Sequence, residues 1–574
     1  MTTHNVYNVQ DYGCVGDNST DNTTNLATAN AAAAATGGQL YFPNGIYITQ
    51  PQVHYANVVW QGESRASSVV KLKNGSNADL LVSDGFATNT GTTNIGIQGF
   101  GLRHITLDAN QANQTALSRC WVVYGWQYEV DDVWFVNGFG GGVYSEWNNG
   151  ANPSECMWSN FKIWNYGGKN GCKGLEYKGP HDSVFVNGVV ATQDSRITYA
   201  TTGNPTYGAT PINGTTGVLP TAGTSFTFAT TSAASTVDYP TSGGKFIVYL
   251  IGLPNPWTLV TYTSCATVGA VTTFSGCTAP QGGQTIPIGV GTQIQGNPTY
   301  GIYQSAPDTG MLVSNVHTWG RNHFGVYYNG GNGAGTFNNC IAEGAFVANV
   351  VFDNGGCAWV GGAIYGTNGQ SGQNFEGGLQ IGQTNNTAAC NINTNIYNCG
   401  SSGGGWTVNM AHTAGANHIF VNGSCGNGNS QWLVKPYYGG DFYLMSNRTN
   451  QGASIFSTMQ SQAQFPGGLY GLVQLNVYSQ TSTNYTLSWT DQATENEFTA
   501  STPVTVTVPP HSSVAYPVGT VMNLRQMGAG QVTVTPGSGV TINSPHGMST
   551  NTRYSTITLI NNGTDTWVLN GDTA

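Results

Sequence analysis

One run near the start of the chain, residues 7–48, joins four elements in a fixed order: a short strand, an acidic glycine-bearing turn, an alanine-rich segment and further extended segments. Residues 26–35 are almost all helix formers, and Gly37 and Gly38 stand where such a helix would end. Four apolar residues then alternate, which predicts that they share one strand face: Leu40, Phe42, Ile46 and Ile48. This order predicts a helix that caps the open end of a β-solenoid.

Short apolar strands followed by an Asn-Gly or Gly-Gly turn recur along the chain. The spacing is 28 residues from Asp132 to Asn160, 23 from Asn160 to Ser183 and 24 from Asn315 to Asn339. Such spacings are typical of one turn of a parallel solenoid, which advances by about 4.8 Å per turn. We therefore expect roughly ten to twelve turns, with inward asparagine side chains stacked in ladders.

Composition agrees with a repetitive all-β chain. Only 7% of the 574 residues are charged, against roughly 25% in an ordinary globular protein. The 80 glycines, with many Asn, Thr and Ser, suit turns between short strands. Because 39% of the residues are hydrophobic, the chain can form a core, which argues against disorder.

Charge and hydropathy exclude several partners. The net charge is −10 and no basic run occurs, so we expect no nucleic-acid partner. The chain contains no uninterrupted stretch of about 18 apolar residues, so we expect no membrane span. The first residues, MTTHNVYNV, lack the basic and apolar regions of a signal peptide.

The eleven cysteines show no CxxC spacing. We therefore expect no zinc or other metal site and no cofactor, and most thiols should point into the coil. Cys265 and Cys277 bracket a predicted hairpin, so an oxidising exterior could join them in a disulfide.

Two interruptions divide the chain. The hexapeptide GNPTYG occurs at 203–208 and again at 296–301, and the residues between read as antiparallel strands of an inserted small β-domain. After about Phe465 strict alternation with sandwich-like loop spacing predicts a β-sandwich. The expected domains are 1–50 (cap), 51–202 (β-helix, first part), 203–298 (insert), 299–465 (β-helix, second part) and 466–574 (C-terminal sandwich).

Two segments resemble known families. Residues 7–48 resemble the N-terminal part of the pectate-lyase-like superfamily of right-handed parallel β-helices. The block from about Phe498 to Gly571, which includes VTVPPHSSVAYPVGTV, resembles the C-terminal tip domain of phage tail fibres and spikes. The resemblances imply an all-β tail spike or tail fibre protein of a virion, assembled in the host cytoplasm. They also imply a parallel homotrimer, contacts with other tail or baseplate proteins, and a host polysaccharide or glycolipid as the ligand.

Acidic and aromatic residues are densest between Glu129 and Glu155, where carboxylates could accept sugar hydroxyls and rings could stack on sugars. The candidate ligand-binding residues are Trp126, Tyr128, Glu129, Tyr144, Trp147 and Trp158. The candidate catalytic pair is Asp132 with Glu155, because their spacing of 23 residues matches one solenoid turn. Asp182 with Asp194 is a weaker pair. The competing interpretation is that such rings are core and such aspartates bond turn backbone.

Two hypotheses remain. Polygalacturonases carry NTD and GHG strings that this chain lacks before its C-terminal domain, so we favour a tail protein that binds a host glycan without cleaving it. The alternative is a tail-spike depolymerase, either a glycoside hydrolase or a polysaccharide lyase.

Overall fold

The structure is a computed structural model of the chain. It describes residues 5–88, 96–147, 155–169, 171–193, 210–211, 217–218, 225–229, 239–249, 257–269, 271–278, 287–288, 293–305, 310–330, 335–354, 356–366, 377–381, 390–397, 399, 406–410, 418–421, 432–436, 476–492 and 494–574.

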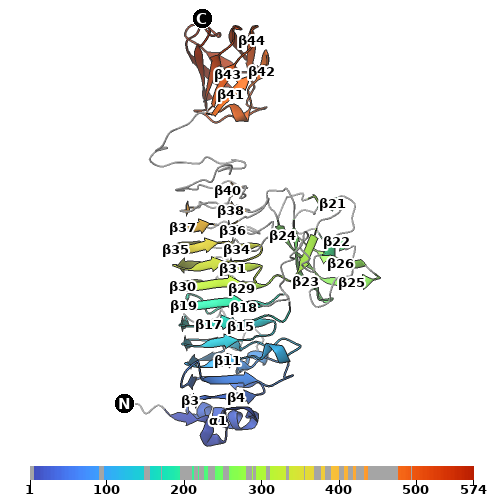
Figure 1. Cartoon of the computed structure of the whole chain (residues 1–574), viewed down its shortest axis with the longest axis vertical. Coiled ribbons are helices and arrows are strands. Elements are labelled where there is room, and N and C mark those ends of the chain that lie inside the picture. Colours follow the sequence, from blue (N-terminus) through green and yellow to red (C-terminus); the bar gives the residue numbers. More distant parts are fainter. Residues whose placement is uncertain are drawn as a thin grey trace. The chain divides into compact units, whose positions relative to one another are not determined.

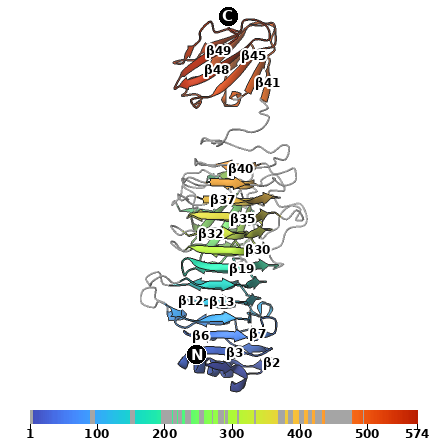
Figure 2. The ribbon, with the colours of Figure 1, turned by 90° about the vertical axis from the view of Figure 1, so that its left-hand side faces the viewer.

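Most described strands wind into a right-handed parallel β-helix whose turns stack along the coil (Figures 1 and 2). Each turn supplies strands to a 19-stranded sheet, here sheet A, and to a 12-stranded sheet, here sheet B. In one turn, β13 (Glu129–Asp131) and β14 (Trp134–Val136) lie in sheet A and β15 (Gly141–Glu146) lies in sheet B. The next turn pairs with it in parallel through β16 (Met157–Ser159), β17 (Lys162–Trp164) and β18 (Lys173–Lys178).

The other strands of sheet A are β1 (Val6–Asn8), β2 (Asp17–Asp21), β3 (Gly38–Phe42), β4 (Gly45–Thr49), β6 (Val58–Gly62), β7 (Ser68–Leu72), β10 (Gly101–Arg103), β11 (Thr106–Asp108), β19 (Ser183–Thr192), β30 (Met311–Gly320), β32 (Gly335–Asn338), β33 (Ile341–Glu343), β35 (Cys357–Tyr365), β37 (Cys390–Tyr397) and β39 (His418–Val421). The other strands of sheet B are β5 (Gln52–His54), β8 (Leu81–Ser83), β12 (Trp121–Trp126), β29 (Tyr300–Gln304), β31 (Phe324–Asn329), β34 (Ala348–Asn354), β36 (Gly377–Ile381), β38 (Trp406–Met410) and β40 (Trp432–Pro436), and β9 (Ile97–Gln98) pairs with β12.

The strand register confirms two of the three predicted spacings. Asp131 pairs with Ser159 and Ser314 pairs with Asn338, which reproduces the periods of 28 and 24 residues. The third was wrong: Ser159 pairs with Val186, so the residue stacked on Asn160 is Asn187 and not Ser183. Turns of the coil therefore differ in length, because the loops between strands differ.

A ladder of polar side chains follows one corner of sheet A, where the chain turns between the two strands of each turn. Its members have left-handed backbone angles (φ from 51° to 58°): Asp132, Asn160, Asn187, Asn315 and Asn339. Each asparagine after the first donates its amide N–H to the amide oxygen of the asparagine before it in the ladder, over 3.4, 3.2 and 2.7 Å. The predicted ladder exists, but it lies on the outer corner, because asparagine tolerates the left-handed conformation that this turn requires.

Large side chains fill the interior of the coil. One inward row of sheet A, which runs through the paired strands from β6 to β35, contains Trp60, Trp158, Phe185, Phe337 and Trp359, each at most 1% exposed. Phe337 and Trp359 lie nearly parallel, with ring centres 5.2 Å apart. Burial of such rings is the main source of stability for a coil with few charges.

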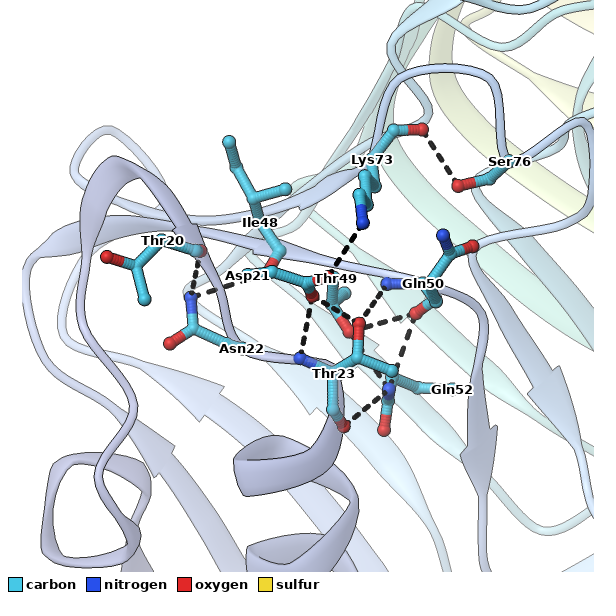
Figure 3. A network of polar contacts seen from close by, with 10 residues as sticks. All are labelled: Thr20, Asp21, Asn22, Thr23, Ile48, Thr49, Gln50, Gln52, Lys73 and Ser76. Atoms are coloured by element: carbon cyan, nitrogen blue, oxygen red, sulfur yellow. Dashed lines mark hydrogen bonds and ion pairs between the residues drawn. The ribbon is translucent and has the colours of Figure 1, made fainter.

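The predicted capping helix is confirmed as α1 (Thr23–Thr36), which ends before Gly37 at φ 70°. Leu26, Ala29 and Ala33 on its inner face are fully buried. Figure 3 shows how the helix start is tied to the first turns: Asp21 accepts from the Thr23 backbone (3.0 Å) and from Lys73 (2.9 Å).

One expectation for the first strands was wrong. Leu40 and Phe42 are fully buried, but Ile46 and Ile48 are half-exposed because Tyr47 between them fills the interior. Alternation alone gives a strand its two faces and does not say which one is buried.

The inserted small β-domain interrupts the coil after β19, which pairs directly with β30 although Ser183 and Met311 lie far apart in sequence. Its described strands pair with one another in antiparallel fashion: β20 (Thr210–Pro211), β21 (Gly217–Val218), β22 (Phe226–Ala229), β23 (Gly244–Tyr249), β24 (Trp257–Tyr262), β25 (Ser264–Val268), β26 (Val271–Cys277), β27 (Pro287–Ile288) and β28 (Gln293–Gly296). Ile247 and Leu259 of the insert pack with Tyr300 and Phe324 of sheet B in one apolar cluster. Cys265 and Cys277 are free thiols, so the suggested disulfide is not formed.

Residues 467–574 form a separate compact unit. One sheet holds β41 (Asn476–Gln480), β43 (Thr494–Phe498), β45 (Val521–Gln526), β48 (Thr556–Gly563), β49 (Thr566–Gly571) and β47 (Thr541–Asn543), and the other holds β42 (Asn484–Thr486), β44 (Val504–Val508) and β46 (Val532–Pro536). Both contribute to one apolar core, as a sandwich requires. Unlike a hairpin-built sandwich, β41–β43–β45 and β42–β44–β46 pair in parallel.

Among the described residues, no helix combines the length and the apolar character needed to cross a bilayer.

Candidate functional site

The predicted catalytic pair is not stacked in the structure. Asp132 follows the end of β13 at the corner of sheet A, whereas Glu155 precedes β16, the strand that pairs with β13. The two carboxylates therefore lie at opposite ends of neighbouring strands. The assumption that 23 residues make one turn here was wrong, because this turn contains 28.

Asp132 has partners that explain its position. Its carboxylate accepts from Arg65 and lies 3.0 Å from Nδ1 of His104. The left-handed backbone and these contacts are those of a corner residue that holds successive turns together. In the second predicted pair, Asp182 also has a left-handed backbone and lies 3.0 Å from His181, while Asp194 lies outside the described residues.

Two of the predicted sugar-binding rings face the interior. Trp158 is 0% exposed and Tyr128 is 1% exposed; the Tyr128 hydroxyl lies 2.8 Å from the Ser145 hydroxyl. The prediction that these two rings stack on a sugar was wrong, because neither presents a face to the outside. Trp126 is half-exposed, and Glu129 is exposed and pairs with Arg103 at 2.6 Å.

The other two predicted residues, Tyr144 and Trp147, lie in and just after β15 of sheet B. The Tyr144 hydroxyl donates to Glu146 and accepts from Lys178 at 3.1 Å. Burial, and then the hydrogen bond to Glu146, raise the pKa of Tyr144. The Trp147 ring meets the imidazole of His181 at 5.0 Å.

Tyr144 borders a surface feature that we call the basic groove, defined by the cations Arg119, Lys169, Lys173, Lys178 and Lys245. The Arg119 guanidinium lies 4.9 Å and the Lys178 ammonium 5.1 Å from the Tyr144 ring centre. Two adjoining cavities of about 190 Å³ each are lined by Lys169, Gly171 and Lys173 in common. Arg119 lines one cavity and Lys245 the other.

Only part of this positive charge is neutralised by named carboxylates. Arg119 binds both oxygens of Asp79, at 3.0 and 2.8 Å, and Lys173 lies 2.5 Å from Glu176. The groove still gathers five of the sixteen Lys and Arg residues of a chain whose net charge is −10. Such a concentration favours an anionic ligand, because charges in a partly desolvated cavity are weakly screened.

The insert completes the groove. Lys245 comes from β23, and it lines the same cavity as Asn297, Tyr300 and Tyr303. Burial, and then the nearby charge of Lys173, lower the pKa of Lys245. The Tyr303 ring lies 4.6 Å from the Lys173 ammonium, and burial raises the Tyr303 pKa to about 12.

The groove presents donors and apolar surface to a ligand. Ammonium and guanidinium groups are donors for carboxylate or sulfate oxygens, and the tyrosine rings offer apolar surface to sugar rings. Among the described residues, no three His, Cys, Asp or Glu side chains are grouped as a metal site would need.

The cations of the groove are residues that sequence reasoning missed. A signal was present: in a chain with 7% charged residues, KNGCKGLEYK places Lys169, Lys173 and Lys178 within ten positions. They were overlooked because they are not contiguous. Lys245 had no such signal, since its approach to the others depends on how the insert folds back on sheet B.

Comparison with known proteins supports the fold. Residues 6–217 match the family model described as rhamnogalacturonase A/epimerase, pectate lyase-like. Mannuronan C5-epimerase AlgE6 of Azotobacter vinelandii is 33% identical over 118 residues, which are 19% of this chain and 13% of that protein. This chain thus spans about an eighth of the length of that relative.

Two solved structures have a chain path similar to that of this protein. The A-module of mannuronan C-5 epimerase AlgE4 from Azotobacter vinelandii has a TM-score of 0.40 at 15% identity and covers 82% of this chain and 98% of its own. The Dettilon tailspike protein has a TM-score of 0.40 at 12% identity, with coverage of 77% and 68%.

Proposed function

We propose that this chain, which carries a pectate-lyase-like parallel β-helix, is a virion tail spike or tail fibre protein that binds an acidic polysaccharide of the host cell surface. The observation that carries the proposal is the basic groove on sheet B. Recognition of the polysaccharide during adsorption is the role that we assign to it.

The dimensions of the groove suit a polymer. Its residues come from the turns that contain β12, β15, β18 and β29, so it extends over three turn intervals, or about 14 Å at the usual strand spacing. A single small anion would need only one of these turns. A chain of acidic sugars places negative charges at regular intervals and can contact all of these turns.

Uronic acids are the acidic sugars that we favour. The relatives that match locally are named for action on mannuronan, a polymer of uronic acid. The carboxylate of each uronate matches the ammonium groups of the groove in charge and in hydrogen bonding.

The virion assignment rests on sequence resemblance. The region from about Phe498 to Gly571 resembles the tip domains of tail fibres and spikes, and it folds within a unit of its own. The same resemblance supports a homotrimer that contacts other tail or baseplate proteins.

A second candidate function is modification or cleavage of the bound polysaccharide. The observation that favours it is the place of Lys245 in the wall of the cavity that Tyr300 and Tyr303 also line. Burial lowers the pKa of Lys245, as a lysine that acts as a general base requires. The family model, named for enzymes, supports the same alternative.

The test is retention of purified protein on immobilised polymannuronate and polygalacturonate, with dextran as the neutral comparison. Replacing Lys169, Lys173 and Lys178 by Gln should abolish retention on the acidic polymers. A matched control, in which Lys71, Arg103 and Arg553 are replaced by Gln, loses the same charge outside the groove and should bind as the native protein does. Equal loss in both variants would contradict the groove assignment.

Analysis of reaction products distinguishes binding of the polysaccharide from its modification or cleavage. Incubation of native protein with the bound polymer, followed by measurement of reducing ends, ultraviolet absorbance of unsaturated uronates and uronate epimer content, should show no change for a binding protein. A change made by the native protein would establish the enzymatic alternative, and loss of that change in Lys245→Met at saturating polymer would assign Lys245 to the reaction.

A further inference from the structure

A row of five positions, three of them aromatic, runs along sheet A, whereas the basic groove lies along sheet B. It occupies one register position on successive strands β17, β19, β30, β33 and β35. We call it the outer aromatic row, and its members are Trp164, Ala191, Trp319, Glu343 and Tyr365.

The rings of Trp164 and Trp319 meet although they belong to alternate turns. Ala191, at the register position between them, is fully buried, and the two indole centres are 5.1 Å apart at an angle of 65°. Both indoles remain half-exposed. Because Ala191 is small, the indoles of Trp164 and Trp319 can meet and form one continuous half-exposed surface.

Polar groups border these rings. The Lys162 ammonium lies 4.1 Å from the Trp164 ring centre. At the register position of Lys162 on another turn, His317 lies on the same side of the row, and its Nε2 is 3.1 Å from a carboxylate oxygen of Glu343. Rings bordered by an amine, an imidazole and a carboxylate match the two kinds of surface of a pyranose, its apolar face and its hydroxyl rim.

The spacing and charge of the row narrow the class of ligand. Successive register positions are one strand spacing apart, about 4.8 Å, and the two indole centres are 5.1 Å apart; both distances are close to the advance of one pyranose unit in an extended chain. The five positions therefore extend over about 19 Å. The Lys162 ammonium beside the row and the Glu343 carboxylate within it carry opposite charges, whereas the basic groove holds an excess of cations.

We propose that the outer aromatic row is a second carbohydrate-binding surface, which takes a neutral, hydroxyl-rich oligosaccharide running along the coil axis. The proposal does not depend on the basic groove, because the two surfaces use different sheets and different charge. A surface polysaccharide that contains both neutral and acidic sugars could be held by both.

The test uses native full-length protein and dextran, mannan, galactan and β-glucan as neutral probes, with polymannuronate to report on the groove. At least one neutral polymer should be retained by the native protein. Trp164→Ala and Trp319→Ala should each weaken this retention about tenfold, the effect expected for loss of one stacked ring, and should leave polymannuronate binding unchanged. Trp319→Tyr, which keeps a ring, should retain most of the binding.

The control is Trp489→Ala, which removes a tryptophan that is 46% exposed in the C-terminal unit and should have no effect. If Trp319→Ala does not fold, Glu343→Gln decides, because loss of the charged acceptor should weaken neutral binding several-fold. The proposal is overturned if no neutral polymer binds, or if these variants bind as the native protein does. It is also overturned if Trp319→Ala lowers the molecular mass by sedimentation, since the row would then be an interface between copies of the chain.

Discussion

Tyr166 and Asn322 are joined by a hydrogen bond of 2.8 Å, in which the phenol donates to the amide oxygen, although 156 residues separate them in sequence. Both side chains are buried in the coil, at 0% and 1% exposure. The intervening sequence contains the inserted domain together with β18, β19, β29 and β30 of the coil. The bond therefore closes the β-helix across the point where the chain leaves it and returns.

Tyr166→Phe should destabilise the β-helix. The substitution leaves the Asn322 oxygen buried without its phenol donor, which should lower the free energy of unfolding by about 1–2 kcal/mol. Urea unfolding followed by circular dichroism measures the change. Tyr41→Phe, at a half-exposed position on β3, is the matched control and should shift the free energy by less than about 0.5 kcal/mol; equal shifts would contradict the role of the bond.

Acid should destabilise the coil through two buried histidines. Nδ1 of His54 accepts from the Trp121 indole at 3.2 Å, and Nδ1 of His323 accepts from the Thr299 backbone at 2.8 Å. Burial lowers the pKa of each ring to about 3. Since the unfolded chain binds these protons near pH 6.5, their stabilisation is complete above that pH and is lost as pH falls toward 3, by up to about 1.4 kcal/mol per pH unit for each ring.

The measurement is the free energy of unfolding between pH 7.5 and 4.5 for native protein and for His323→Asn, whose amide oxygen can replace Nδ1 as the acceptor. The variant should lose about one proton equivalent of pH dependence. His511→Asn, at an exposed position in the C-terminal unit, should leave the dependence unchanged. An unaltered slope in His323→Asn would assign the acid sensitivity to other groups.

The sequence predicted the architecture because the solenoid repeats one pattern many times. The helix at 26–35 and the corner spacing from Asp132 to Asn160 could be read directly, since each rests on local propensity or on a repeated turn residue. The position of Glu155 relative to Asp132 could not be predicted in this way. Loop length varies from turn to turn, so the number of residues between two positions does not say whether they share a turn or a strand end.

The alternation of residues along a strand also did not show which of its two faces is buried. In VWFV the ring of Phe135 is fully buried while Trp134 is half-exposed, and in GIYIT it is Tyr47 that fills the core. The basic groove was harder still to predict, because Arg119, Lys173 and Lys245 come from distant segments that only tertiary structure brings together. A rule based on spacing sees contacts within one repeat, and this site lies between a repeat and an insertion.

The corner ladder should be sensitive to side-chain shape. Asn187 has φ 55° and joins the amides of Asn160 and Asn315. Asn187→Gly keeps the left-handed backbone and loses only the amide contacts, so we expect a cost below about 1 kcal/mol. Asn187→Val adds a branched side chain that this conformation disfavours and should cost about 1–3 kcal/mol more. Thermal unfolding ranks the variants, and a valine variant as stable as the glycine variant would argue against backbone strain at the corner.

Lys245 should favour binding at the expense of stability. Burial and the charge of Lys173 lower the pKa of Lys245 in the folded protein. Between this lowered pKa and the usual pKa of lysine, the folded state therefore binds fewer protons than the unfolded state. Across that interval the contribution of Lys245 to the free energy of unfolding rises with pH. Below it, the buried ammonium is a penalty. Lys245→Met removes the penalty, so at neutral pH it should raise the free energy of unfolding by about 0.5–2 kcal/mol and weaken retention on polymannuronate. Lys71→Met, at a half-exposed position on β7, should change neither quantity. A Lys245→Met protein that is less stable than the native protein and binds equally well would show that this lysine is a structural residue of the insert and takes no part in the groove.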